Sequence, residues 1–515
     1  MAYLRLYMNL LTSTSIFSFF TLISRILGYL RDILIAFFLG ASIFADAFFV
    51  AFRLPNTFRR LFAEGTFNAA FIPSYTSARI ENKVKGKRFA DDILGSLLLI
   101  VILIVTIVEI FTPYLVYAIA PGFIADSIKF NLAVELTRIT FPFLLFVSLS
   151  SFFSGILNSN NKFAAAAAAP IILNIILILS LIASYKLNLN FAKQLSYGVT
   201  LAGILQLTFL FFVTLKFYKP NINFKFKVDN KVRFFFKKLI PSIFSSGITQ
   251  INILIGTIIA SFEAGAVSYL YYADRIYQIN LAIAGIAVGT VSLPALSKAF
   301  KNKNIKKLSN IQNKSFELSL LLSIPASLGL ILASEEIVNA LFGYGSFSLE
   351  DVQKTADALK YFGYGVPAFA LVKILSNFFF ARDNTKIPFY ISTVMVVINL
   401  SISISLFSSF GFIIIPIATS IATWIGVLFY IYLLRQKKSL LLNIQLIPNF
   451  LKILASSIIM CFILLLTLHN YASYLDYTYK FKAIYLLLIV GFAGIVYLLS
   501  CYLLGILKIK NYKTN

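Results

Sequence analysis

Charged residues are scarce in this chain. Of its 515 residues only 13% are charged, whereas a soluble globular protein carries about a quarter. One histidine and two cysteines are too few for a clustered His/Cys metal site or a disulfide framework. Cys461 and Cys501 both lie in apolar runs, where we expect core residues. No Walker loop, metal-binding motif or Ser/His/Asp set occurs. We therefore expect no cofactor, no metal and no catalytic residues, and ATP hydrolysis and most enzymatic functions are disfavoured.

Long apolar runs fill most of the sequence. The chain is 59% hydrophobic and its mean hydropathy is +0.87. Unbroken runs rather than alternation predict a polytopic helical membrane protein and argue against a barrel. No cleavable signal sequence is expected, so the first span must itself direct insertion. The net charge of +25 would suit nucleic-acid binding. The basic residues instead sit in short loops between apolar runs, so no nucleic-acid partner is expected.

The apolar runs predict an all-α fold of about fourteen transmembrane helices. About six of them precede a polar, basic stretch, and about eight follow it. The predicted spans are 12–40, 44–72, 91–120, 131–157, 164–185, 196–217, 239–262, 266–297, 313–333, 351–381, 387–409, 411–434, 449–470 and 483–507.

Loop charge predicts the orientation. Alternate loops are rich in Lys and Arg, whereas the intervening, outer loops hold Asp126 with Lys129, Glu263, Glu335 with Glu336, and Asp476. Cytoplasmic loops carry the excess of basic residues, and an even number of spans returns the chain to the side where it began. Both termini are therefore expected in the cytoplasm. The basic loops contain Arg79 to Arg88, Lys162, Lys216 to Arg233, Lys298 to Lys307, Arg382 with Lys386, and Arg435 to Lys438.

The basic stretch divides the chain into two lobes, and an internal sequence repeat suggests that these lobes are pseudo-symmetric. EGTFNAAFIPSYTSA ends the second predicted span and AVGTVSLPALSKAF ends the eighth, each with Gly-Thr, a Pro and a Ser before a basic loop. Repeated halves with a site at their interface are a common plan for transporters. The expected domains are an N-terminal lobe (1–218), a cytoplasmic basic connector (219–238), a C-terminal lobe (239–434), and two additional helices with a short tail (435–515).

The first two predicted spans carry ionisable residues at or near bilayer depth. Each costs a few kcal/mol or more unless it faces a partner or a water-filled cavity. Arginines outnumber acids here, which suggests the wall of an anion-binding cavity. The alternative is a structural salt-bridge seam, which would need no surplus of arginine. These residues are Arg25, Arg31, Asp32, Asp46, Arg53, Arg59, Arg60 and Glu64.

A second polar group, YYADRIYQIN, lies in the eighth predicted span and contains Asp274 and Arg275. It occupies the place in its lobe that the charged second span has in the first. A local charge balance between the two residues is an equally good interpretation. Neighbours in a helix do not face each other, however, so each would need another partner.

Four segments closely resemble the MurJ (MviN) family of lipid II flippases, within the multidrug/oligosaccharidyl-lipid/polysaccharide exporter superfamily. They are SRILGYLRD, ADAFFVAFRLPNTFRRLFAEGTFNAAFIP, SYLYYADRIYQ and VGTVSLPALSK. The resemblance runs through the whole chain. It implies transport of lipid II, the undecaprenyl-pyrophosphate-linked precursor of peptidoglycan, from the inner to the outer leaflet of the bacterial cytoplasmic membrane. Membrane lipids and the cell-wall synthesis machinery are the other expected partners.

The resemblance also implies roles for individual residues. Arg25, Arg31, Arg59 and Arg275 match cavity arginines that engage the pyrophosphate and head group. The last two helices resemble a groove-forming pair that guides the polyprenyl tail. The expected gating or structural charge partners are Asp32, Asp46, Arg53, Glu64 and Asp274.

Some members have a sodium site built partly from carboxylates in the later lobe. Between Asp383 and Asp476 this chain has no Asp or Glu, only neutral oxygens such as those of Asn399, Thr419 and Thr423. Membrane potential acting on a cationic cavity is then the simpler driving force. The alternative functions are export of another lipid-linked oligosaccharide or of drugs, and, less favoured, a membrane glycosyltransferase or a channel. A charged cavity disfavours apolar drugs, and the large loops of a glycosyltransferase are missing.

Overall fold

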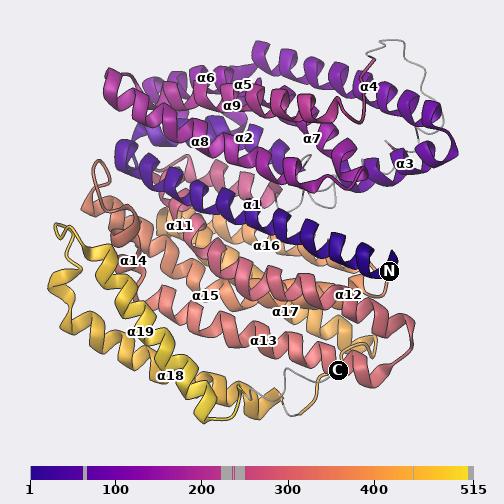
Figure 1. Ribbon diagram of the computed structural model, residues 1–515. Helices are drawn as coiled ribbons and strands as arrows, with labels where there is room; N and C mark the ends of the chain where they lie inside the picture. Colours follow the sequence, from indigo (N-terminus) through magenta and orange to yellow (C-terminus); the bar gives the residue numbers. More distant parts are fainter. Residues whose placement is uncertain are drawn as a thin grey trace. The chain divides into compact units, whose positions relative to one another are not determined.

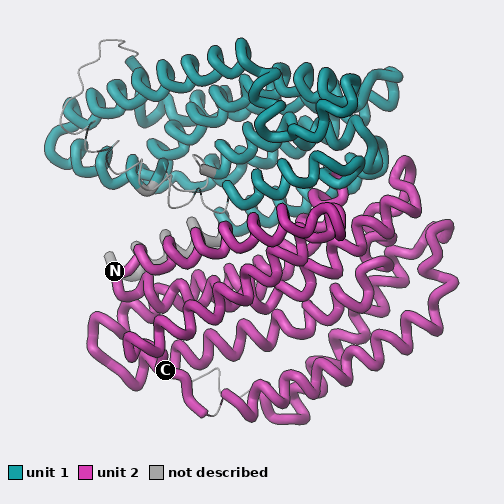
Figure 2. The backbone as a smooth tube through the Cα atoms, turned by 180° about the vertical axis from the view of Figure 1, so that it is seen from behind, with its two compact units in different colours: residues 1–267 teal, residues 268–515 magenta. Residues whose placement is uncertain are grey.

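The computed structural model describes residues 2–61, 67–221, 250–444 and 446–507, together with 233, 235, 237 and 247 (Figure 1). Every regular element in this part of the chain is a helix, which confirms the predicted all-α fold. The chain divides into two compact units, Met1–Val267 and Ser268–Asn515 (Figure 2). The predicted connector 219–238 lies mostly outside the described residues. The helical stretch Gln250–Ala260 belongs to the first unit.

The described part of the first unit contains α-helices of eight to 38 residues. Its helices are α1 (Ala2–Leu39), α2 (Ile43–Leu61), α3 (Phe67–Glu81), α4 (Lys83–Ile110), α5 (Thr112–Ile119), η2 (Pro121–Ala125), α6 (Ser127–Thr140), α7 (Phe143–Ser159), α8 (Phe163–Leu187) and α9 (Phe191–Thr214).

The second unit begins within α11 and contains one π-helical segment, η3. Its elements are α11 (Ala266–Leu281), η3 (Ala282–Ala287), α12 (Val288–Lys301), α13 (Ile305–Leu332), α14 (Ser334–Phe342), α15 (Leu349–Phe380), α16 (Lys386–Phe410), η4 (Gly411–Ile413), α17 (Ile414–Gln436), α18 (Leu446–Asn470), η5 (Ala472–Tyr474) and α19 (Lys482–Leu503).

Polar side chains mark where several helices begin. The Asp126 carboxylate accepts hydrogen bonds from the backbone N–H groups of Ile128 and Lys129 at the start of α6. Ser348 and Asp351 form a reciprocal capping box at the start of α15. The first N–H groups of a helix have no partner within it, so these side chains satisfy donors that lipid could not. The α6 cap also fixes the position of Lys129, which is part of the site described below.

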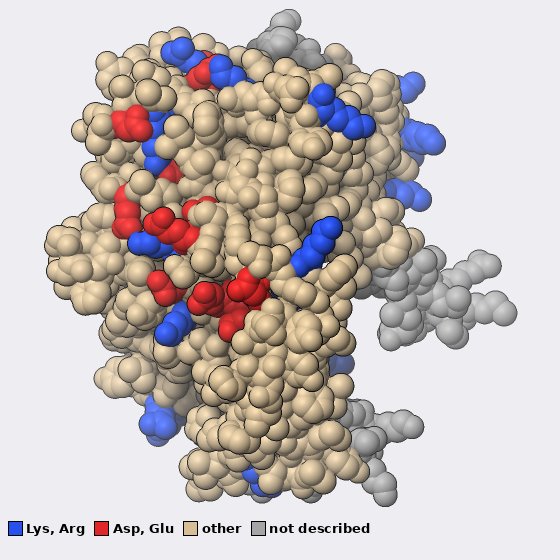
Figure 3. All heavy atoms as spheres, turned by 90° about the vertical axis from the view of Figure 1, so that its left-hand side faces the viewer, with Lys and Arg blue, Asp and Glu red and all other residues tan. Residues whose placement is uncertain are grey.

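Ten helical stretches in the described residues are long and apolar enough to cross a membrane. One of them, Lys386–Gln436, is 51 residues long and contains both α16 and α17. One such stretch can hold two spans, so the ten stretches do not give the number of spans, and fourteen stays a prediction. Most of the surface visible in Figure 3 is formed by uncharged side chains, as expected where helices face lipid.

The predicted second and eighth spans each fall on more than one described element. Residues 44–72 fall on α2 and α3, and the intervening residues 62–66 lie outside the described part. Pro55 lies inside α2. Residues 266–297 fall on α11, η3 and α12. Candidate site residues lie on both of these segments.

Candidate functional site

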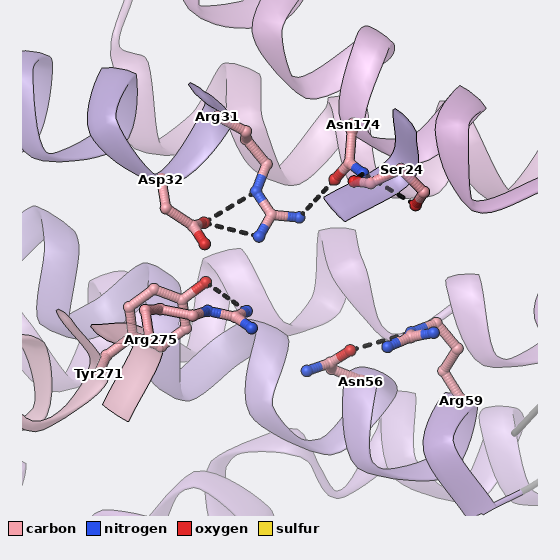
Figure 4. Close-up of polar contacts among 8 residues, drawn as sticks. All are labelled: Ser24, Arg31, Asp32, Asn56, Arg59, Asn174, Tyr271 and Arg275. Atoms are coloured by element: carbon pink, nitrogen blue, oxygen red, sulfur yellow. Dashed lines mark hydrogen bonds and ion pairs between the residues drawn. The ribbon is translucent and has the colours of Figure 1, made fainter. Parts of the chain in front are cut away.

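Arg31 and Asp32 form an ion pair within α1 (Figure 4). Asp32 Oδ1 accepts from Arg31 Nη2 at 2.6 Å and from Arg31 Nε at 2.9 Å. Only 7% of the Arg31 side chain and 3% of the Asp32 side chain are exposed. The guanidinium thus turns one edge toward the carboxylate of the next residue. This is the contact expected for Asp32 as an arginine partner, while its role in a gate stays a prediction.

Asn174 of α8 holds the other side of the same guanidinium. Its Oδ1 accepts from Arg31 Nη1 at 2.9 Å, and its Nδ2 donates to the backbone carbonyl of Ser24 at 2.8 Å. Asn174 is buried, and Figure 4 shows it between these two groups of α1. Asn174 was not among the predicted site residues. A single amide in the apolar run PIILNIILIL was the available signal, because polar groups inside membrane helices usually bond across helices.

The other candidate arginines of the first unit are more accessible. Arg59 is half-buried, and its Nε donates to Asn56 Oδ1, one turn back in α2, at 3.0 Å. Arg25 on α1 is exposed and Arg53 on α2 is half-buried. Glu64 lies outside the described residues, so its expected role is not tested.

In the second unit, Asp274 and Arg275 turn to different neighbours on α11. Arg275 Nη2 donates to the Tyr271 hydroxyl at 2.8 Å, and its guanidinium carbon lies 4.8 Å from the Tyr271 ring centroid. The Asp274 carboxylate accepts from the amide of Gln278. Each residue therefore has a partner four residues away on the same helix, which is a spacing that brings side chains together. The Arg275 guanidinium lies over the face of the Tyr271 ring, and this contact orients it.

Among the predicted acids that the structure describes, Asp46 is the most deeply buried. It is fully buried, and its Oδ2 accepts from Lys129 Nζ at 2.6 Å and from the backbone N–H of Gly265 at 2.9 Å. Lys129 also lies over the Phe123 ring, 4.1 Å from its centroid. Gly265 has a φ of 76°, which favours glycine. The carboxylate thus connects α2, α6 and the loop before α11. Lys129 was expected only in an outer loop.

The neutral oxygens of the later spans form a small hydrogen-bonded group. Asn399 Oδ1 of α16 accepts from Ser403 Oγ at 3.3 Å and from Thr419 Oγ1 of α17 at 3.4 Å. In the part of the chain that the structure describes, no group of three or more His, Cys, Asp or Glu residues is placed to hold a metal ion. These long contacts involve no carboxylate, and we assign no ion to them.

Comparison with known proteins gives a match along nearly the whole chain. The family model described as "Lipid II flippase MurJ" matches residues 35–486. A probable lipid II flippase MurJ of Rickettsia prowazekii is 38% identical over 517 residues, covering 99% of this chain and 100% of the relative. The corresponding protein of Rhizobium tropici is 37% identical over 503 residues, covering 96% and 94%.

Solved structures show the same similarity. "Lipid II flippase MurJ, inward closed conformation" has a TM-score of 0.81 and 28% identity, covering 95% of this chain and 98% of that one. An inward-facing multidrug transporter of the MATE family has a TM-score of 0.66 at 15% identity and covers 81% of this chain. The second similarity shows the fold alone.

Proposed function

The chain belongs to the MurJ family of lipid II flippases, and from this premise we propose that it carries lipid II from the inner to the outer leaflet of the bacterial cytoplasmic membrane. It is a transporter and not an enzyme. The observation that carries the proposal is the buried Arg31 guanidinium, held between Asp32 and Asn174 within an apolar helix. An arginine kept at such cost is expected to serve a substrate that needs it.

The chemistry of the substrate fits this arrangement. A diphosphate with a large polar head cannot cross hydrocarbon unaided, and planar guanidinium groups bind phosphate oxygens in pairs. Asp32 occupies the Nε and Nη2 edge of Arg31, which is the edge that a phosphate would use. We propose that the diphosphate displaces this carboxylate, while Asn174 keeps the guanidinium oriented. Arg25, Arg59 and Arg275 contribute further contacts.

Transport follows an alternating-access cycle, with lobes at 1–218 and 239–434 and with the added helices of 435–515 guiding the lipid tail. Fluorescent lipid II reconstituted with the purified protein in liposomes tests the proposal. We expect the protein to make inner-leaflet lipid II accessible to an external reagent. A fluorescent phospholipid in the same vesicles should stay protected. Equal exposure of both lipids, or of neither, would refute a lipid II flippase.

The proposed orientation places both termini in the cytoplasm and predicts a pattern of chemical labelling. In a chain whose Cys461 and Cys501 are replaced by alanine, cysteines at the exposed positions Lys85 and Lys303 should resist an impermeant maleimide in intact cells. A cysteine at exposed Ser473 should react. Lysed cells supply the control, because all three positions should then react. Labelling of Lys85→Cys or Lys303→Cys from outside would reverse the orientation.

The driving force is proposed to be membrane potential rather than sodium. Exchanging Na⁺ for K⁺ on both sides should leave the flipping rate within about twofold, because Asn399, Ser403 and Thr419 supply no charge to hold a cation. One charge crossing the full field gains about 2.3 kcal/mol per 100 mV. Dissipating the potential with valinomycin should therefore slow flipping roughly tenfold or more. Flipping that stops in potassium alone would assign the coupling to sodium.

A further inference from the structure

The last two helices, α18 and α19, form a hairpin in the second unit (Figure 1). We propose that this hairpin is fastened to α13 and α14 at both of its ends and moves with them as one body. This inference rests on the proposed function. It means that the hairpin guides the lipid tail from a fixed position on α13 and α14 and does not move away from them as a gate. Three sets of contacts carry the inference.

The first set joins α13 to the segment that leads into α18. Gln312 is fully buried; its Oε1 accepts from the Leu441 N–H at 2.9 Å and its Nε2 donates to the Ser439 carbonyl at 3.1 Å. Asn313 Nδ2 donates to the Leu441 carbonyl at 2.9 Å, and its Oδ1 accepts from the Asn443 N–H at 2.8 Å. The two side-chain amides thus bond the backbone of residues 439–443 much as a neighbouring β-strand would. They satisfy backbone groups that lie outside any helix.

The second set joins α14 to the opposite end of the hairpin. Lys482 at the start of α19 is 1% exposed. Its ammonium donates to Asn339 Oδ1 at 2.8 Å, to the Gly343 carbonyl at 2.6 Å and to the Tyr477 carbonyl at 2.7 Å. Asn339 in turn donates to the Leu475 carbonyl at 2.8 Å. An ammonium has three N–H donors, so these contacts use all of them.

Aromatic rings complete this end. The Lys482 ammonium lies 4.3 Å from the Tyr344 ring centroid and 4.7 Å from that of Tyr477. The Tyr477 hydroxyl donates to the Phe347 carbonyl at 2.7 Å. The buried charge is therefore stabilised by dipoles and ring faces drawn from both sides of the junction. Separating α19 from α14 would leave a buried ammonium without several of its acceptors.

The third set lies along the helices between the two ends. The Tyr497 hydroxyl of α19 donates to the Leu321 carbonyl of α13 at 2.7 Å. Asn449 Nδ2 of α18 donates to Glu317 Oε1 of α13 at 3.1 Å. Lipid is as apolar as the helix faces, so hydrophobic burial alone holds membrane helices weakly. Polar contacts at both ends and between them are what fix this hairpin.

The first test cross-links each end of the hairpin to the segment it contacts and then measures lipid II flipping. In a chain lacking native cysteines, Asn313→Cys with Asn443→Cys bridges one end, and Tyr344→Cys with Tyr477→Cys bridges the other. A short bis-methanethiosulfonate joins each pair, and reducing agent releases it. We expect bridged protein to flip lipid II at half or more of the rate of the released protein. The four single-cysteine variants are the controls. A tenfold loss on bridging that reducing agent reverses would overturn the proposal.

Spin labels on exposed residues outside these contacts, Asn310 with Ile447 and Glu335 with Lys480, test rigidity without any transport assay. Each pair should give one narrow distance distribution, unchanged by lipid II. A second distance population in the otherwise unmodified chain would overturn the proposal, whether or not the protein flips lipid II. Lys482→Met, which keeps an unbranched side chain of similar length but removes its donors, should create that second population at the Glu335/Lys480 pair and leave the Asn310/Ile447 pair narrow. Failure of the parent protein to flip lipid II would instead refute the proposed function.

Discussion

Alanine at Arg25, Arg59 or Arg275 should abolish rescue of a flippase-depleted strain while leaving the protein in the membrane. Each side chain lies on a predicted transmembrane span and is exposed or half-buried, so its loss need not disturb the fold. Losing one bidentate contact to a phosphate in a partly desolvated site should cost roughly 2–5 kcal/mol. That corresponds to about thirty- to several-thousand-fold in affinity. Lipid II binding and cell survival at matched expression measure the effect.

Two comparisons separate charge from geometry in these variants. Lysine at the same positions should rescue only partly, because a point charge returns without the planar fork. Arg435→Ala is the matched control, since this arginine is exposed near the end of α17 and is expected to be nearly silent. Alanine variants that bind lipid II and grow like the parent would leave only the salt-bridge seam as an explanation for the arginines.

Arg31 needs a second substitution, because its alanine variant has two effects. Removing the guanidinium leaves the Asp32 carboxylate, only 3% exposed, without its ion-pair partner, and such a loss typically destabilises a fold by about 3–5 kcal/mol. Arg31→Ala should therefore lower both the amount of protein and transport. Arg31→Ala with Asp32→Asn should restore the amount of folded protein but not transport. Recovery of both would make Arg31 a structural residue.

The sequence predicts individual charged positions better than their partners. Asp32 was predicted as a charge partner, and it contacts Arg31, the residue before it in the chain. Asn174 is 143 residues from Arg31, and Lys129 is 83 residues from Asp46. Nothing local selects such partners, since they depend on which helices pack together. Helix type follows from apolar runs that must satisfy their own backbone groups in lipid, which is why the all-α fold was predictable and these pairs were not.

Asp46 shows how a partner changes the interpretation of a residue. From the sequence it is expected to be a gating or structural charge partner. In the structure its carboxylate binds Lys129 and the Gly265 N–H, and it is fully buried. A buried carboxylate with an ammonium at 2.6 Å and a backbone donor has its main hydrogen-bonding needs met. We therefore expect a structural role, and substitution of Lys129 distinguishes the two.

Lys129→Met should lower the thermal stability of the purified protein sharply, because it leaves Asp46 buried and without its cation. Breaking one side of a buried pair costs about 3–5 kcal/mol, whereas replacing both charges is often close to neutral. Asp46→Asn with Lys129→Met should therefore regain the parent's melting temperature, since an amide oxygen can still accept from Gly265, and it should flip lipid II. Lys193→Met is the matched control, because the N–O distance of the Lys193–Glu135 ion pair is similar, at 2.7 Å, but both side chains are exposed. The melting temperature of this variant should equal that of the parent. A double variant that is stable yet inactive would make Asp46 part of the gate after all.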